Sequence, residues 1–381
     1  MYIMTFDVKY PSLGHVRMRA KRRLPYFVWE YLDSGTGSET AISRNRAALE
    51  DVELMPSILH GELTPRLDTE LLGRSYSLPV GIGPVGMSGL IWPNAENILA
   101  KTSRDLKIPY TLSTVASKTP EQLSADIGDC GWFQLYPPRE PDMRKDILQR
   151  VRNAGFGTLV LTVDVPVGSR RERMTRSGLT QPPRLTPRIL WQISRCPAWT
   201  AGMVRAGMPR MKLIDDYAPK TSGLPSNKHM GYLLRTSPDW QYLRTLREEW
   251  KGPFVVKGVL DKSDAIKLEK EGVDALWVSN HGGRQFDAAP SSAAALASIR
   301  KAVKLPLIMD GGIEGGLDVL RAMALGADFI MMGRAWHVAL AALGGKGPAH
   351  LAKILKADIE ANMGQLGLSH PKDSCRRLIN H

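Results

Sequence analysis

The chain contains little cysteine, with only Cys130, Cys196 and Cys375 among its 381 residues. The three are far apart, odd in number and outside any Cys-x-x-Cys or Cys/His pattern. The sequence therefore indicates neither a disulfide framework nor a zinc site, and we predict no metal ligands. Sparse, unpaired cysteine is typical of a protein from a reducing compartment.

The chain also lacks an uninterrupted apolar run of membrane-spanning length. The best candidate, residues 75–95, is uncharged over 21 residues but contains four Gly and three Pro. That composition favours a strand and loops over a membrane helix. A charged N-terminus followed by an apolar core is missing too, so we expect no secretory signal and a cytoplasmic location.

Acidic residues are absent between Arg173 and Ile214, a window that holds eight Lys and Arg residues. This window supplies most of the formal net charge of +13. A uniformly basic surface would favour nucleic acid as the partner, whereas a single basic segment bearing Trp and Met favours a local interaction. We therefore predict no nucleic-acid partner.

Short apolar runs alternate with helix-like stretches from residue 78 onward. The runs are almost continuously apolar, which is typical of parallel strands buried on both faces. Eight strand–helix units predict an α/β fold, a closed (β/α)8 TIM barrel. An open doubly wound sheet is the main alternative, weakened by the lack of Gly-x-Gly-x-x-Gly after the first run. The runs are 78–84, 110–113, 131–136, 158–164, 253–258, 275–280, 305–311 and 327–333, and helices are predicted at 94–106, 141–154, 262–271, 291–303 and 315–325.

Two segments do not follow the repeat in the predicted single domain of residues 1–381. Residues 1–75 form an N-terminal extension of helices plus a connecting strand, ahead of a barrel at 76–364. Residues 165–239 form a long basic insertion after the fourth strand, and loops of that length are usually functional or disordered.

The window 173–214 of this insertion also has apolar residues at helical spacing. Ile189 is followed by Ile193, with Trp191 between them, and Trp199 is followed by Met203. Aromatic rings and cations on such helices predict an anchor that lies on an anionic membrane surface. A solvated basic loop or a lid over the active site is the alternative.

Polar residues gather where the apolar runs end, and in a barrel these ends converge on one site. The most informative segment is Ser279-Asn280-His281-Gly282-Gly283-Arg284-Gln285. Its Arg can fork onto a carboxylate, and its His can move a proton near neutral pH. Gly-rich turns after the seventh and eighth runs predict a phosphate pocket beside this pair. Each residue alone is more often an ordinary turn or core residue, so the prediction depends on their coincidence at eight strand ends.

These motifs, in this order, resemble the FMN-dependent L-2-hydroxy acid oxidising family, which includes glycolate oxidase, bacterial L-lactate dehydrogenase and (S)-mandelate dehydrogenase. The resemblance covers nearly the whole chain. Besides residues 279–285, it is carried by Trp132-Phe133-Gln134-Leu135-Tyr136 and by Thr162-Val163-Asp164 followed by Arg170-Arg171-Glu172.

The resemblance implies FMN as the cofactor and a role for each matching position. His281 would be the catalytic base, oriented by Asp164, and Lys257 would stabilise the reduced flavin. The substrate would be bound by Tyr31, Tyr136, Arg171 and Arg284. The cofactor would be held by Lys257 together with Pro84, Val85, Gly86, Ser113, Gln134, Thr162, Ser279, Asp310, Gly311, Gly312, Gly333 and Arg334.

The implied activity is oxidation of an L-2-hydroxy acid, with L-lactate as the first candidate, to the 2-oxo acid. The basic insertion favours a membrane quinone as electron acceptor, which would place the protein peripherally at the inner face of the cell membrane. The resemblance also implies a homo-oligomer, a tetramer.

Four other functions are kept as alternatives. An (S)-mandelate dehydrogenase or an oxygen-using 2-hydroxy acid oxidase would share the site, since Gly86 leaves room above the flavin. More remote are another FMN barrel enzyme, such as an isomerase or an inosinate-type dehydrogenase, and a non-catalytic basic binding protein. The inosinate type needs a catalytic Cys on a barrel loop, and neither Cys130 nor Cys196 ends a predicted strand.

One position departs from the family pattern. An Arg usually follows the Asp-x-Gly turn after the seventh strand, where it is expected near the FMN phosphate. Here Asp310-Gly311-Gly312-Ile313 is followed by Glu314. This replaces a cation with an anion and predicts either weaker FMN binding or a nearby Arg that restores the contact.

Overall fold

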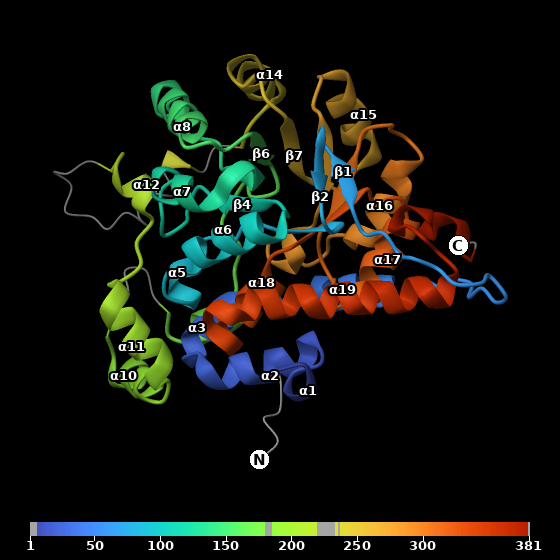
Figure 1. Ribbon diagram of the computed structural model, residues 1–381. Coiled ribbons are helices and arrows are strands. Elements are labelled where there is room, and N and C mark those ends of the chain that lie inside the picture. The colour runs from blue at the N-terminus through green and yellow to red at the C-terminus, as the bar shows by residue number, and fades with distance from the viewer. Residues whose placement is uncertain (1–5, 180–184, 219–232, 235–236, 380–381) are drawn as a thin grey trace.

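The computed structural model describes residues 6–179, 185–218, 233–234 and 237–379. Eight parallel strands close into a barrel in the order β10-β3-β4-β5-β6-β7-β8-β9, and helices surround it (Figure 1). The predicted (β/α)8 TIM barrel is confirmed and the doubly wound sheet is wrong. The strands are β3 (Val80–Ile82), β4 (Tyr110–Ser113), β5 (Gly131–Leu135), β6 (Thr158–Thr162), β7 (Phe254–Val259), β8 (Ala275–Val278), β9 (Leu307–Met309) and β10 (Phe329–Met332).

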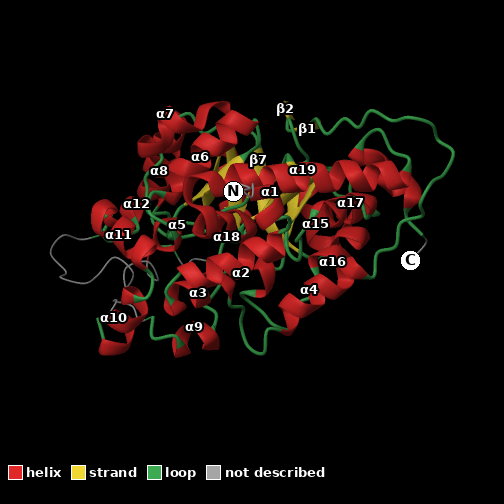
Figure 2. Cartoon of the chain, turned by 60° about the horizontal axis from the view of Figure 1, so that its bottom comes forward, coloured by secondary structure: helices red, strands yellow, loops and turns green. Residues whose placement is uncertain are grey.

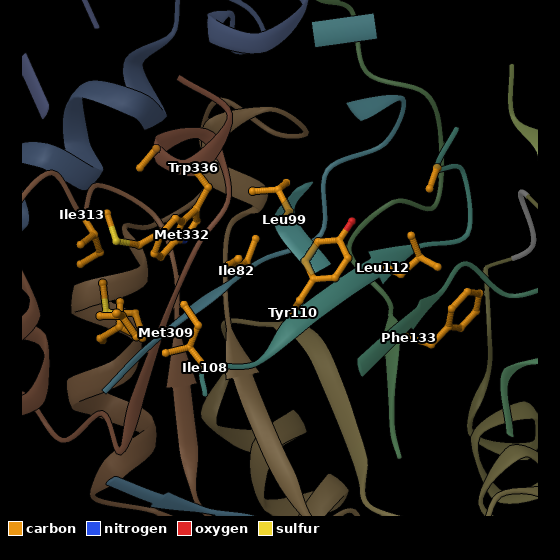
Figure 3. Close-up of a cluster of buried hydrophobic side chains, with 14 of the residues drawn as sticks. Ile82, Leu99, Ile108, Tyr110, Leu112, Phe133, Met309, Ile313, Met332 and Trp336 are labelled. Atoms are coloured by element: carbon orange, nitrogen blue, oxygen red, sulfur yellow. The ribbon is translucent and has the colours of Figure 1, made fainter. Parts of the chain in front are cut away.

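Seven of the predicted apolar runs contain one of these strands, and the run at 253–258 overlaps β7, which ends one residue later. The runs are apolar because both faces of each strand are covered. All five residues of β6 are buried, for example. Inward-facing side chains such as Trp132, Trp277 and Phe329 fill the barrel. Outward-facing side chains such as Ile82 and Met332 pack against the helices, and Figure 3 shows this layer together with Trp336 of α18.

The five predicted barrel helices are confirmed to within a few residues. Two of them begin at a side-chain cap, as the sequence chemistry requires. Asp261 accepts hydrogen bonds from the backbone of Ser263 and Asp264, and Ser291 accepts one from Ala294. The helices around the barrel are α5 (Ser88–Ile91), α6 (Ala95–Leu106), α7 (Ser124–Ile127), α8 (Pro141–Asn153), α14 (Trp240–Glu249), α15 (Lys262–Lys270), α16 (Ser292–Arg300), α17 (Gly316–Ala324), α18 (Arg334–Leu343) and α19 (Gly347–Leu366).

The N-terminal extension contains the helices α1 (Phe6–Lys9), α2 (Leu13–Arg23), α3 (Tyr26–Asp33) and α4 (Thr40–Glu50). The single connecting strand predicted here is wrong, since β1 (Thr69–Leu71) and β2 (Arg74–Tyr76) pair as a hairpin. Leu72 and Gly73 both have positive φ, 52° and 75°, and such a two-residue turn reverses the chain. The hairpin packs against the barrel interior, where the Tyr76 hydroxyl accepts a hydrogen bond from Trp132 at 3.2 Å.

The insertion after β6 forms α9 (Glu172–Arg176), α10 (Pro187–Ser194), α11 (Pro197–Ala206) and α12 (Lys212–Asp215). The predicted helical spacing in 173–214 is therefore confirmed as α10 and α11, which project from the barrel beside α3 and α5 (Figure 1). Residues 180–184, with the cation Arg184, and 219–232 and 235–236 lie outside the described residues. Among the described helices, none combines the length and the apolar character needed to cross a membrane.

The face of α10 and α11 assigned to the membrane is partly wrong. Trp199 is only 4% exposed, because its indole donates a hydrogen bond to the carbonyl of Leu90 and its ring lies edge-on to Phe27. Helical spacing identifies a common face but not what that face packs against. The outward apolar surface is a different set, here called the exposed apolar set: Leu190, Trp191, Val204 and Met208, with exposed fractions of 52–79%.

Candidate active site

One cavity of about 510 Å³ lies where the carboxyl ends of the barrel strands converge. Its lining extends from Leu13 to Ala335 and includes residues of α2, α3, α4 and the insertion. All the predicted site residues except Asp164 and Ser279 line it directly. They are Tyr31, Pro84, Val85, Gly86, Ser113, Gln134, Tyr136, Thr162, Arg171, Lys257, His281, Arg284, Asp310, Gly311, Gly312, Gly333 and Arg334.

His281 sits in an unusual turn directly after β8. Its φ is 57°, and Gly282 and Gly283 follow at 62° and 74°. Left-handed backbone is uncommon for a side chain other than Gly, and such strain persists only where the surroundings hold it. The Ser279 hydroxyl accepts a hydrogen bond from the His281 backbone at 2.9 Å and so helps to fix the turn.

Asp164 determines which nitrogen of His281 faces the cavity. Its Oδ1 is 2.9 Å from His281 Nδ1. A carboxylate at Nδ1 assigns the proton to that nitrogen and leaves Nε2 free to accept one. Burial alone raises the pKa of Asp164, but the charges of His281 and Lys257 outweigh it and keep the pKa below its usual value. Asp164 therefore remains an anion beneath the imidazole.

Lys257 is a buried cation at the end of β7. Its Nζ donates to Ser279 Oγ at 2.9 Å and lies 3.4 Å from Asp310 Oδ2 and 3.7 Å from Asp164 Oδ2. Burial lowers the pKa of Lys257, yet the two carboxylates more than offset this and raise it. Ser279 thus supports Lys257 and His281 from behind the cavity wall.

Two arginines flank the ring of Tyr31. The guanidinium carbons of Arg171 and Arg284 lie 5.5 Å and 5.8 Å from the ring centroid. Arg284 donates to the carbonyl of Tyr31 at 3.0 Å, and Arg171 donates to Ser34 Oγ at 2.9 Å. Burial followed by repulsion from Arg284 lowers the pKa of Arg171 to about 9, and burial also lowers that of Arg284. Two adjacent cations, one buried and one half-buried, favour an anionic ligand.

The two tyrosines present hydroxyls to the same space. Tyr31 donates to the carbonyl of Gly86 at 2.8 Å. Burial, reinforced by the negative charge of Asp164, raises the pKa of Tyr136 well above its usual value, so its hydroxyl keeps its proton. It is therefore a potential donor to an oxygen of the ligand.

The barrel mouth carries polar atoms that suit a flavin. Gln134 Nε2, Thr162 Oγ1 and Asp310 Oδ1 are buried and have no hydrogen-bond partner among the described residues. All three residues line the cavity, so these atoms are available to hydrogen-bond a bound ligand. Ser113 Oγ donates to Gln134 Oε1 at 2.8 Å and thereby turns the amide donor toward the cavity. An isoalloxazine ring and its ribityl chain would supply the missing partners.

The turns after β9 and β10 form the opposite end of the cavity. Gly311 and Gly312 have φ of 96° and 84°, and a Cβ on Gly312 would lie 2.7 Å from the carbonyl oxygen of Asn45. Only Gly fits there. The side chain of Arg334, at the N-terminus of α18, donates to the carbonyl of Gly282 at 3.0 Å. Backbone N–H groups and a cation at a helix start favour a phosphate.

Several lining residues come from the N-terminal extension and were not predicted. Arg17 and Arg46 reach the phosphate end, and Asp33 lies between them and the arginines of the insertion. Glu314 does not stand alone, because its Oε1 pairs with Arg17 at 3.3 Å across 297 positions of sequence. Such a contact leaves no local signal in the sequence.

Asn280, in the segment 279–285, stabilises the turn that carries His281. It exchanges two amide hydrogen bonds of 2.8 Å with Asn45 and thus ties the His281 turn to α4. Its side-chain oxygen also accepts from the backbone of Gly283. The turn that carries His281 and Arg284 is therefore braced from the extension as well as from the barrel.

A closed parallel barrel with a phosphate turn, unpartnered flavin-facing atoms and a His/Arg pair defines a flavin-dependent oxidoreductase. Residues 20–381 match the family model described as FMN-dependent dehydrogenase. The chain belongs to this family, which acts with FMN on 2-hydroxy acids.

Individual relatives match over nearly full length. The L-lactate dehydrogenase of Acinetobacter baylyi is 39% identical over 377 residues, covering 97% of this chain and 98% of that protein. That of Stenotrophomonas maltophilia is 38% identical over 371 residues, covering 96% and 97%. Among solved structures, the monotopic membrane protein (S)-mandelate dehydrogenase matches with a TM-score of 0.91 and 32% identity, covering 97% and 99%. A mandelate oxidase matches with a TM-score of 0.81 and 31% identity, covering 97% and 98%.

Proposed function

We propose that this protein oxidises L-lactate to pyruvate, with His281 as the base, and passes the electrons to a membrane quinone. The observation that carries the proposal is the convergence of the Asp164–His281 pair, the Arg171–Arg284 pair and the flavin-facing atoms on one cavity. The naming of its relatives as L-lactate dehydrogenases supports the choice of substrate.

The charged and polar residues of the cavity have different proposed roles. Arg284 and Arg171 bind the substrate carboxylate, and Tyr136 donates to the carboxylate or hydroxyl oxygen. This orientation presents the C2 hydroxyl to Nε2 of His281, which takes its proton as Asp164 stabilises the resulting imidazolium. The C2 hydrogen leaves with its bonding electron pair, and FMN, when bound, would supply the acceptor for both. The fixed cation of Lys257 stabilises the negative charge that develops beside it.

The names of the relatives favour a small substrate. A Cβ at Gly86 would lie 2.7 Å from Val115 Cγ2, so the Val115 side chain already narrows the space beside Gly86. (S)-Mandelate is the second candidate, supported by the structural match to (S)-mandelate dehydrogenase. Anaerobic mixing of the FMN-loaded protein with L-lactate, D-lactate or (S)-mandelate separates the candidates through the loss of flavin absorbance. Faster reduction by (S)-mandelate than by L-lactate would refute the lactate assignment.

The insertion supports the proposed electron acceptor and location. A monotopic membrane enzyme is among the structural relatives, and the exposed apolar set lies on α10, on α11 and just after α11, next to basic residues. Such a surface suits peripheral binding to the inner face of the cell membrane. Reoxidation of the reduced protein by a short-chain quinone should outpace reoxidation by oxygen, whereas the reverse order would identify an oxidase. We also propose a homotetramer, which size-exclusion chromatography with light scattering would test.

A further inference from the structure

The phosphate end of the cavity contains a cation from an unexpected part of the chain. Arg17 lines the same cavity as Arg334, although it belongs to α2 of the N-terminal extension. Helix α2 is fixed to α18, since Arg19 Nε donates to the carbonyl of Ala342 at 2.8 Å. Figures 1 and 2 both show α2 next to α18, the helix that begins at Arg334. Packing of one helix on another therefore holds Arg17 beside the phosphate turns.

Two hydrogen bonds orient the guanidinium of Arg17 and leave some of its N–H donors free. Its Nη1 donates to Asp33 Oδ1 at 2.6 Å, and its Nη2 donates to Glu314 Oε1 at 3.3 Å. Since an arginine has five N–H donors in one plane, these contacts leave three for a further anion. The Arg17 side chain is 31% exposed, so it is open to the cavity rather than sealed beneath it.

The other cations at this end differ from Arg17 in their surroundings. The donors of Arg46 are used within the protein. Its Nε donates to Glu50 at 2.7 Å, and its Nη1 donates to Asp318 and to the carbonyl of Gly312. It braces the turn. Arg334 is half-buried, and loss of water followed by repulsion from neighbouring arginines, Arg17 among them, lowers its pKa to about 10. An anion between Arg17 and Arg334 would relieve that repulsion.

We propose that Arg17 contacts the FMN phosphate together with Arg334 and so supplies the cation that Glu314 removes from the barrel turn. Glu314 is then a positioning residue, since its carboxylate holds one end of the Arg17 guanidinium. The inference rests on the proposed function only in taking FMN as the cofactor. It makes the N-terminal extension part of the phosphate site.

The test compares FMN with riboflavin, which has the same ring and ribityl chain but no phosphate. Each flavin is titrated into the apoprotein, and binding is followed by quenching of flavin fluorescence. Arg17→Gln should weaken FMN binding by roughly 10- to 100-fold, the effect of losing one charge-assisted contact, and leave riboflavin binding within about twofold. Arg22→Gln, a matched loss of charge at an exposed position of α2, should change neither.

A double variant restores a cation at the phosphate end of the cavity, this time from the turn after β9. Arg17→Gln combined with Glu314→Arg should regain at least about tenfold in FMN affinity over Arg17→Gln alone. Unchanged FMN binding in Arg17→Gln, an equal loss for both flavins, or no recovery in the double variant would each overturn the inference. A parent protein that binds no FMN at all would instead overturn the proposed function, so the two failures are distinguishable.

Discussion

Asp164 and His281 are 117 positions apart in the chain, yet Asp164 Oδ1 lies 2.9 Å from His281 Nδ1 at the mouth of the barrel. The pair joins the end of β6 to the turn after β8. Because it leaves Nε2 of the imidazole facing the cavity, its geometry makes the role of His281 directly testable.

His281→Gln should abolish substrate oxidation and leave a yellow, FMN-loaded protein. Gln keeps the bulk of the side chain but accepts no proton, and losing a general base typically costs at least 10²–10⁴-fold in rate. The measurement is the anaerobic rate of flavin reduction by excess L-lactate. His60→Gln, at an exposed His of the extension, should keep the parental rate. A normal rate in His281→Gln would remove His281 from the mechanism.

Asp164→Asn should destabilise the protein in a pH-dependent way. The folded pKa of Asp164 lies below its usual value, so its anion stabilises the fold above the unfolded pKa of about 3.9. That contribution is lost only as the pH falls through the lowered folded value. Unfolding temperatures of the holoprotein should therefore differ above the unfolded pKa and converge as the pH falls through the lowered folded value. A difference that persists after the carboxyl group has been protonated would contradict the assignment.

Arg284→Lys should raise KM for the hydroxy acid by roughly 10- to 100-fold, with a smaller change in the affinity for FMN. Arg284 is held by the carbonyls of Tyr31 and Leu32, and its remaining N–H groups form a planar fork that an ammonium group lacks. Steady-state kinetics with a soluble dye as acceptor gives KM. Arg22→Lys is the matched control, and an unchanged KM in Arg284→Lys would place the carboxylate elsewhere.

Replacing Leu190 and Trp191 with Ser should weaken membrane binding. Both belong to the exposed apolar set, and Arg195 lies 4.7 Å from the Trp191 ring centroid, so a cation accompanies the apolar surface. Co-sedimentation with vesicles rich in anionic lipid measures the loss, while dye reduction by L-lactate should stay at the parental rate. The control replaces Ile58 and Leu59 of the extension, which are even more exposed, at 82% and 99%. If both double variants sediment like the parent, α10 does not form the anchor.

Glu96→Gln should stabilise the protein at neutral pH. Glu96 is fully buried, and burial raises its pKa because two backbone donors, Gly89 and Ser117, do not offset the loss of water. The ionised carboxylate of Glu96 therefore lowers the stability of the folded state. The parent protein gains stability as the pH falls toward the unfolded pKa of about 4.3, because the carboxyl group becomes protonated. The variant should melt about 1–3 °C higher at pH 8, with the gap closing toward pH 5. A lower melting temperature at pH 8 would show that the anion is needed.

The barrel could be predicted because each strand is buried on both faces, and this burial makes its own sequence almost continuously apolar. The run at 158–164, which contains β6, is almost continuously apolar, and the same holds for the runs of the other seven strands. The strand-end residues could be predicted for a related reason, since a closed barrel brings all strand ends together whatever their separation in the chain.

The features that could not be predicted depend on contacts between distant segments. Nothing around Glu314 indicates that its partner is Arg17, because the pairing exists only once α2 has packed on α18. Trp191 and Trp199 look alike in sequence, and only the packing of α11 on Phe27 buries one and leaves the other exposed. The β1–β2 hairpin was missed because Leu72, a residue that rarely takes positive φ, forms half of its turn.

The seam of the barrel has a consequence for biogenesis. Ile330 of β10 pairs with Val80 of β3, so the last barrel strand to leave the ribosome closes against the first. Until then β3 has an open edge, which invites pairing with other chains. The cavity spans the same seam, because Gly86 and Gly333 both line it. A flavin bound there would connect early and late segments, and the supply of FMN during synthesis should therefore set how much of the chain escapes aggregation.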